Sequence, residues 1–158
     1  MHFGILSCSS TRRPETDRAG DVLSAGIVAS DGTVTRRALV PDDRAQIAAH
    51  LRRWVEERAC DVILTTGGTG LGPLDVTPEA TGDVLTREVP GLAEYLRMRG
   101  MEETPFAALS RGRAGMVDRV LVVNLPGSVA AVRSGLDLLL PLLPHAKAVI
   151  GGAGHTGA

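Results

Sequence analysis

A short apolar run that ends in a cluster of glycines constrains the fold more than any other feature of this sequence. Val62, Ile63 and Leu64 follow one another without a polar break, and four glycines lie between positions 67 and 72. A continuous apolar run of this length is typical of a strand that is buried on both faces of a parallel sheet. Because such a strand needs helices on both sides of the sheet, the segment predicts an α/β fold.

The rest of the chain alternates between strand-like and helix-like segments. Strands are predicted over residues 3–8, 33–40, 62–64 and 119–124, with 33–40 a possible edge strand. Helices are predicted over residues 17–29 and 90–98, and from Asp43, Thr77 and Ser128 onward. This alternation predicts a mostly parallel central sheet covered on both faces. The length of 158 residues fits a single domain, 1–158, whose small, polar end at 151–158 is predicted to be a flexible tail.

Composition disfavours several classes of function. A formal net charge of -1 and an aromatic content of 3% give neither the basic surface nor the stacking platform of nucleic-acid-binding proteins. The longest apolar run, residues 138–143, is far shorter than the roughly 20 residues of a membrane span. Cys8 and Cys60 lack zinc-ligand spacing and are predicted to be buried thiols in a reducing compartment. We therefore expect a cytoplasmic protein that does not bind a membrane.

Two predicted strands end in unusual loops. Residues 66–70 read Thr-Gly-Gly-Thr-Gly, and residues 124–128 read Asn-Leu-Pro-Gly-Ser. In open parallel sheets, ligands bind beyond the carboxyl ends of the strands. These two strand ends are therefore the candidates for a ligand site.

The loop at 66–70 is suited to an anion. Glycines accept positive φ angles and allow a ligand to approach the backbone, and successive N–H groups in such turns can surround a phosphate. The lysine of a Walker loop is missing. A tight turn without a ligand is the alternative interpretation.

A carboxylate and a helix start follow this loop. Asp75 lies just beyond it, and Thr77, Pro78 and Glu79 begin a predicted helix, whose N-terminus favours anions. A phosphate and a carboxylate repel each other unless a cation bridges them, and Mg²⁺ typically takes one or two protein carboxylates. In the alternative interpretation, Asp75 is a turn residue and Glu79 interacts only with the helix dipole.

Three motifs resemble the signature of a known family. Residues 65–70 (Thr-Thr-Gly-Gly-Thr-Gly) with 75–80 (Asp-Val-Thr-Pro-Glu-Ala) form the first, 124–128 the second, and 109–112 (Leu-Ser-Arg-Gly) the third. Together they resemble the molybdenum-cofactor biosynthesis family, which includes the MogA and MoaB types and the G domains of gephyrin. The resemblance extends from Phe3 through the last predicted helix.

The resemblance implies a three-layer α/β/α sandwich and a homotrimer. It implies transfer of AMP from ATP to the molybdopterin phosphate with Mg²⁺ as cofactor and pyrophosphate as the second product. A molybdenum-inserting enzyme is the implied downstream partner. Two alternatives stay open: a non-catalytic molybdopterin-binding scaffold of the MoaB type, and a generic nucleotide-binding regulatory module.

Asp75 matches the essential aspartate of the family and Asp42 matches a second active-site aspartate, and we predict that both are catalytic and hold Mg²⁺, directly or through water. Further contacts to the nucleotide, the phosphates or the pterin are predicted at Ser7, Ser9, Arg12, Thr66, Gly67, Gly68, Thr69, Gly70, Thr77, Glu79, Ser110, Arg111, Asn124, Gly127 and Ser128.

Several of these assignments have alternatives. Arg12 and Arg111 are equally suited to a structural ion pair or a subunit contact, and Asn124 to a hydrogen bond that holds the turn at Pro126. The chain also departs from many relatives at two positions. Ser10 stands where they have an aspartate, so no acidic role transfers there, and Val129 stands where they have a proline.

Overall fold

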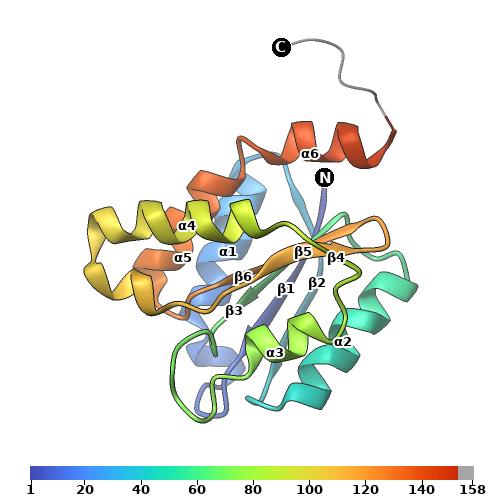
Figure 1. Ribbon diagram of the computed structural model, residues 1–158. Coiled ribbons are helices and arrows are strands. Elements are labelled where there is room, and N and C mark those ends of the chain that lie inside the picture. The colour runs from blue at the N-terminus through green and yellow to red at the C-terminus, as the bar shows by residue number, and fades with distance from the viewer. Residues whose placement is uncertain (153–158) are drawn as a thin grey trace.

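The computed structural model describes residues 1–152 and contains one six-stranded sheet flanked by helices (Figure 1). The strands are β1 (His2–Cys8), β2 (Thr33–Val40), β3 (Val62–Thr66), β4 (Arg87–Glu88), β5 (Ala114–Val117) and β6 (Val120–Leu125). The α-helices are α1 (Arg18–Ala29), α2 (Arg44–Glu56), α3 (Thr77–Gly82), α4 (Pro90–Glu103), α5 (Val129–Leu139) and α6 (Leu143–Ile150). Two 3₁₀ helices, η1 (Pro14–Thr16) and η2 (Pro105–Leu109), complete the elements.

The helices form two layers, one on each face of the sheet (Figure 1). Strand β3 shows why: Val62 and Leu64 belong to the apolar core under α1, α4 and α5, whereas Ile63 belongs to the core under α2 and α3. Side chains alternate between the two faces of a strand, so a continuous apolar run fills both cores. The predicted three-layer α/β/α architecture is confirmed.

The strand order is β2-β1-β3-β6-β5-β4. The pairs β2–β1, β1–β3 and β3–β6 are parallel, and the remaining two pairs are antiparallel. Strand β2 lies at an edge, as its alternating sequence predicted. The parallel strands all end at one end of the sheet, which is the lower end in Figure 1.

The sequence prediction missed the antiparallel strands β4 and β5. Strand β5 is short and contains Gly115, and its turn to β6 consists of Asp118 and Arg119. Asp118 has φ 53°, a conformation for which hairpin turns usually use glycine or asparagine. Because the turn contains neither glycine nor asparagine, the sequence of residues 114–117 did not indicate a strand. Helix α4 also continues to Glu103 rather than ending at Met98.

The predicted flexible tail, 151–158, lies outside the described residues except for Gly151 and Gly152, which end α6. Within residues 1–152, no helix is both long and apolar enough to cross a bilayer.

A buried carboxylate joins β1, α1 and β2. Asp17 is 2% exposed, caps α1 by accepting a hydrogen bond from the Gly20 amide, and accepts another from the Ser7 hydroxyl at 2.7 Å. A terminal guanidinium nitrogen of Arg37 on β2 lies 3.0 Å from the same carboxylate and forms an ion pair with it. Burial alone would raise the pKa of Asp17, but the bonds from Ser7, Gly20 and Arg37 hold that pKa below its ordinary value. These contacts anchor both ends of the segment 9–16.

Replacing Asp17 by Asn removes the charge and keeps the size of the side chain. We expect Asp17→Asn to lower the free energy of unfolding by about 1–3 kcal/mol at pH 7, because hydrogen bonds to a charged group are weakened. A carboxyl with a lowered pKa stabilises the fold above its unfolded pKa, and this contribution is lost as pH falls through the folded pKa. Urea titrations should therefore show the difference between the two proteins shrinking as the pH is lowered below about 4. An equal difference at pH 7 and at the lowest pH tested would contradict this role.

Candidate functional site

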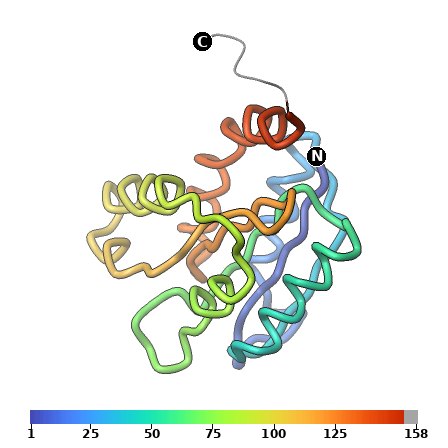
Figure 2. The backbone as a smooth tube through the Cα atoms, turned by 45° about the vertical axis from the view of Figure 1, so that its right-hand side comes forward, coloured from blue at the N-terminus to red at the C-terminus, as the bar shows by residue number. Residues whose placement is uncertain are grey.

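The loops after β1, β3 and β6 meet at one end of the sheet. Ser7 of β1 lies beside Thr66 of β3, which in turn lies beside Leu125 of β6. The segments 9–16, 67–76 and 126–128 therefore leave the sheet next to one another. Figure 2 shows residues 67–76 as an open loop that projects from this end of the molecule. Both glycine-containing loops of the sequence prediction are thus brought together.

Hydrogen bonds join these loops directly. The Thr66 hydroxyl donates to the Pro126 carbonyl at 2.7 Å, and the Gly67 amide donates to the Leu125 carbonyl at 3.2 Å. Gly67 and Gly68 have φ angles of 95° and 62°. A methyl group at Gly67 would lie less than 3.0 Å from the Cys8 carbonyl oxygen. Gly67 is therefore required both for its conformation and for the close approach of β1.

Asp42 faces the first half of this loop. Its carboxylate accepts a hydrogen bond from the Ser10 amide at 2.7 Å, and its own amide donates to the Ser10 hydroxyl at 2.9 Å. The other carboxylate oxygen lies 3.3 Å from the position a Cβ would take at Gly68. The sequence analysis assigned Ser10 no acidic role and no other role in its place. Its position after β1, next to the strand that precedes Asp42, was the available signal for this contact.

Asp75 faces the second half of the loop. Its carboxylate accepts a hydrogen bond from the Gly72 amide at 2.7 Å. The same oxygen lies 3.0 Å from the Cβ position at Gly70 and 2.8 Å from that at Gly72. Asp42, from the loop after β2, and Asp75, beyond the glycines, thus both lie beside the glycine turn.

The described residues contain no cluster of three or more His, Cys, Asp or Glu side chains able to hold a metal ion. A cation at this site would therefore have at most the two aspartates as charged protein ligands. That donor set suits Mg²⁺, which commonly keeps water and substrate phosphate oxygens in its shell.

Thr77 closes the loop from the side of α3. Its amide donates to the Gly68 carbonyl at 3.1 Å, and its hydroxyl lies 2.5 Å from the Cβ position at Gly68. This hydroxyl is buried and has no hydrogen-bond partner among residues 1–152. Nearby, burial raises the pKa of the Cys8 thiol to about 12, so Cys8 stays protonated and neutral at physiological pH.

The two arginines predicted at the site have different surroundings. One terminal nitrogen of Arg12 donates to the Gly127 carbonyl at 2.6 Å, while the other is buried without a partner in the described chain. The Arg12 amide donates to the Ser9 hydroxyl at 3.2 Å, which fixes the loop that carries it. Arg12 therefore has a donor available beside Gly127.

Arg111, in contrast, is occupied by protein groups. Its guanidinium donates to the carbonyls of Gly70 and Asp75 and to the Glu79 carboxylate. The bond from Arg111 is the main reason that the pKa of Glu79 is lowered. The Arg111 amide also donates to the Thr69 carbonyl at 2.8 Å. Each guanidinium nitrogen of Arg111 thus already has a protein partner, while each terminal nitrogen keeps a second N–H, so a direct ligand contact stays a prediction.

Two further predicted residues are enclosed in the fold. The Asn124 amide nitrogen donates to Thr65 at 2.9 Å and to Thr81 at 2.8 Å, and its oxygen accepts from the Arg113 amide. Ser7 donates to Asp17, as described above. Both side chains thus support the sheet behind the site, because their polar atoms are already bonded and buried. The turn at Pro126 is held by Thr66 rather than by Asn124.

Ser128 lies at the surface and caps α5 by accepting a hydrogen bond from the Ala131 amide at 3.3 Å.

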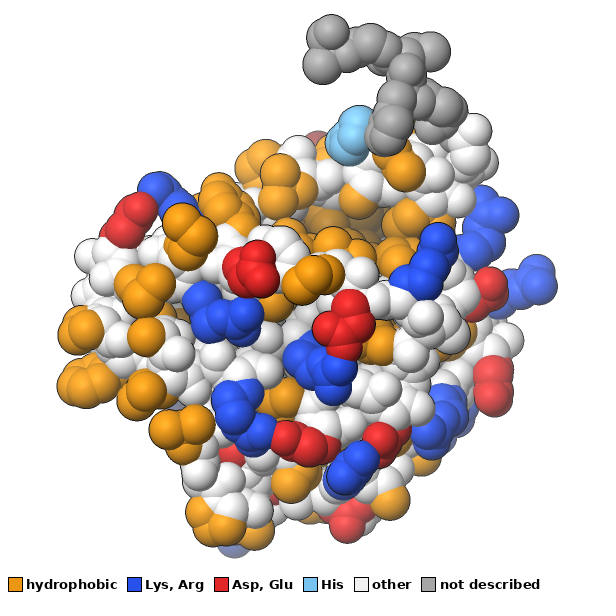
Figure 3. Space-filling view, viewed as in Figure 1, with side chains coloured by type: hydrophobic (Ala, Val, Ile, Leu, Met, Phe, Trp, Pro, Cys, Tyr) orange, Lys and Arg blue, Asp and Glu red, His pale blue; other side chains and the backbone are white. Residues whose placement is uncertain are grey.

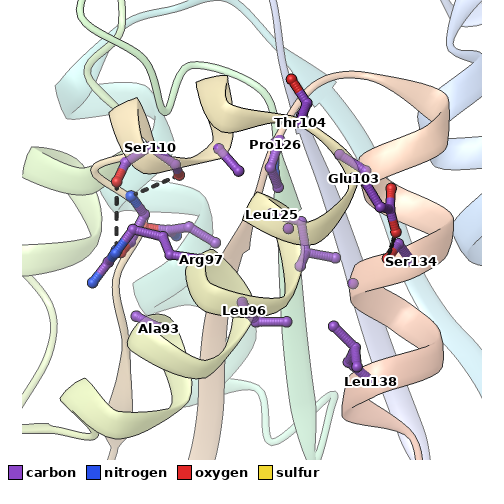
Figure 4. A pocket seen from close by; sticks show the side chains of 16 residues that line it. Ala93, Leu96, Arg97, Glu103, Thr104, Ser110, Leu125, Pro126, Ser134 and Leu138 are labelled. Carbon is purple, nitrogen blue, oxygen red and sulfur yellow. Dashed lines mark hydrogen bonds between the residues drawn. The ribbon is translucent and has the colours of Figure 1, made fainter.

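Ser110, in the third motif, lines a cleft between α4 and α5 together with Leu96, Arg97 and Leu125 (Figure 4). The volume of this cleft is about 70 Å³, whereas ligand pockets commonly measure roughly 300–1,000 Å³. In this conformation the cleft is too small to hold a pterin by itself.

A larger hollow of about 770 Å³ lies at the opposite end of the sheet, between α4, α6 and the start of β6. Figure 3 shows it at the top of the molecule, with apolar side chains on its walls. None of the residues predicted for the site lines this hollow. The candidate site therefore lies away from this hollow, among the polar groups at the other end of the sheet.

Changing Gly67 tests the packing that brings the loops together. We expect Gly67→Ala to lower the free energy of unfolding by about 1–2 kcal/mol from the left-handed conformation alone, with a further loss from the contact with Cys8. Gly91 in α4 is a matched control, because a methyl group there meets no atom within 4 Å. Gly91→Ala should be neutral or stabilising in the same denaturant titration. Equal stability of the two variants would contradict the assignment.

Comparison with known proteins places this chain in one family, over a range that includes nearly all of the sheet. Residues 4–145 match the family described as "Probable molybdopterin binding domain". The chain is 34% identical over 151 residues to the "Molybdopterin adenylyltransferase" of Helicobacter pylori J99, covering 92% of this chain and 85% of that protein. The crystal structure of the molybdopterin biosynthesis enzyme MoaB from Thermus thermophilus superposes with a TM-score of 0.87 at 44% identity, covering 96% of both chains.

Other relatives are much longer. The chain is 42% identical over 152 residues to the "Molybdenum cofactor synthesis protein cinnamon" of Drosophila melanogaster, covering 94% of this chain but only 25% of that protein. It spans 43% and 48% of two further curated relatives. The similarity therefore concerns one segment of these larger proteins.

Proposed function

This chain belongs to the family of molybdopterin-binding domains that serve molybdenum-cofactor biosynthesis, and we propose that it is a molybdopterin adenylyltransferase. It transfers AMP from ATP to the terminal phosphate of molybdopterin and releases pyrophosphate. One observation carries the proposal: Asp42 and Asp75, from two different loops, border the same glycine turn. This turn, with its positive φ angles at Gly67 and Gly68, is suited to phosphate oxygens.

In this reaction an oxygen of the molybdopterin phosphate attacks the α-phosphorus of ATP. The oxygen–phosphorus bond to pyrophosphate breaks, and pyrophosphate carries away the electron pair. A phosphate monoester is already ionised near neutral pH, so the protein does not have to supply a strong base. The main obstacle is the repulsion among several negative charges. Positioning and electrostatic stabilisation by the protein are the means to overcome it.

The residues at the loop fit such a task. Asp42 and Asp75 would hold Mg²⁺, which neutralises phosphate charge when it is bound. Backbone amides of the turn at 68–70 orient phosphate oxygens, and Arg12 offers its unpaired nitrogen for a charge-assisted hydrogen bond. The buried thiol of Cys8 stays protonated, so it is no nucleophile. No covalent enzyme intermediate is needed.

The decisive experiment combines the protein with ATP, MgCl₂ and molybdopterin. We expect adenylylated molybdopterin, detected by mass spectrometry, and an equal amount of pyrophosphate. Binding of molybdopterin in a calorimetric titration without pyrophosphate release would instead support the non-catalytic scaffold. Binding of ATP alone would support a regulatory nucleotide-binding module.

Neutralising Asp75 tests its role. We expect Asp75→Asn to leave the circular dichroism spectrum unchanged and to lower kcat by about 100-fold or more, a loss typical of removing one electrostatic contact to the transition state. Asp83→Asn is the matched control, because Asp83 pairs with Arg44 on the outer surface. Its rate should stay close to that of the wild type. Near-normal turnover by Asp75→Asn would refute the assignment.

Assembly, location and partners are proposals that rest on membership of the family. We propose a cytoplasmic homotrimer that passes its product to a molybdenum-inserting enzyme. Light scattering on the purified protein measures the number of chains in the assembly directly, and a mass other than that of three chains would contradict the homotrimer.

A further inference from the structure

The guanidinium group of Arg111 spans the base of the loop that carries Asp75. Nε donates to the Gly70 carbonyl at 2.7 Å, where the loop leaves the glycine turn. One terminal nitrogen donates to the Asp75 carbonyl at 2.5 Å, where the loop returns. The other terminal nitrogen is paired with Glu79 in the first turn of α3. One side chain thus joins both ends of the loop to the helix that follows.

Arg111 is itself fixed from both sides. Its amide donates to the Thr69 carbonyl at 2.8 Å, and the carbonyl of the next residue, Gly112, accepts a hydrogen bond from Arg97 of α4 at 2.8 Å. The position of the guanidinium is therefore set by α4 and by the loop backbone.

The loop needs such a support. Four of its residues between 67 and 72 are glycines, which lose more conformational freedom on ordering than any other residue. Within the loop, the Asp75 carboxylate accepts a hydrogen bond from the Gly72 amide at 2.7 Å. Without bonds at its two ends, the loop would hold this carboxylate in many orientations.

We infer that Arg111 is a positioning residue for adenylyl transfer, which acts by holding Asp75 and does not bind the phosphates of ATP. The inference rests on the proposed function for its kinetic consequences. It differs from a phosphate-binding role in a measurable way: loss of Arg111 lowers kcat through Asp75, while the affinity for ATP stays nearly unchanged.

The first test uses the protein without substrates. We expect Arg111→Ala to accelerate amide hydrogen exchange of residues 69–75 by tenfold or more, while the amides of α2 exchange as in the wild type. Arg111→Lys should behave in the same way, because an ammonium group cannot reach three separated acceptors in one plane. Arg111→Lys keeps the positive charge of the side chain. It therefore provides the same test if Arg111→Ala does not fold. Unchanged exchange of residues 69–75 in the lysine variant would overturn the inference.

The second test is a double-mutant cycle with Asp75. We expect Arg111→Lys to lower kcat at least tenfold with the KM for ATP within twofold, and to cause no further loss in the Asp75→Asn background. Additive losses, or a KM for ATP raised tenfold at unchanged kcat, would show that Arg111 acts on the substrate and would overturn the inference.

Arg113→Ala serves as the matched control. Arg113 is two residues away and is similarly exposed, but its guanidinium pairs with Glu88 of β4 and donates to the Pro78 carbonyl of α3 at 3.5 Å, without a hydrogen bond to residues 67–76. Loop exchange and kcat should stay within twofold of the wild type, and an effect as large as that of Arg111→Lys would overturn the inference. If the wild-type protein forms no adenylylated product, the proposed function fails, and the exchange test of loop support still stands on its own.

Discussion

The site depends on the close packing of three parallel strand ends. Gly67 leaves β3 with a conformation that L side chains rarely adopt, and it lies against the Cys8 carbonyl on one side. On the other side, a Cβ atom added at Gly127 would lie 3.3 Å from the Gly67 Cα atom. Because no side chain separates these backbones, the loops after β1, β3 and β6 share one small volume. Every polar group of the site reaches the glycine turn from one of these loops or from a neighbouring segment.

The two arginines at this turn show how identical side chains take different tasks. Arg111 has a protein partner at each of its three guanidinium nitrogens and holds the loop that presents Asp75. One terminal nitrogen of Arg12 has no partner among the described residues. A buried guanidinium donor without a partner is costly. A phosphate placed next to Gly127 would remove that cost, which supports our proposal of Arg12 as the phosphate contact and of Arg111 as the support of the loop.

The layer architecture and the location of the site follow from local properties of the chain. The apolar run at 62–64 requires a core on each face of the sheet, and the glycines after Thr66 require an unusual backbone. The resemblance of the motifs to one family added Asp42, which no local pattern singles out. The antiparallel edge was not predictable, because the turn at Asp118 lacks the residues that normally mark a hairpin.

The role of each polar side chain, in contrast, became clear only from the folded chain. Ser7, Asn124 and Arg111 were expected to touch a ligand, yet their polar atoms are bonded to other protein groups. Ser10 was assigned no role in the site, yet its amide and its hydroxyl both bond to Asp42. The reason is physical: a hydrogen bond depends on which atoms lie within about 3 Å of each other, and residues far apart in the chain supply most of these partners.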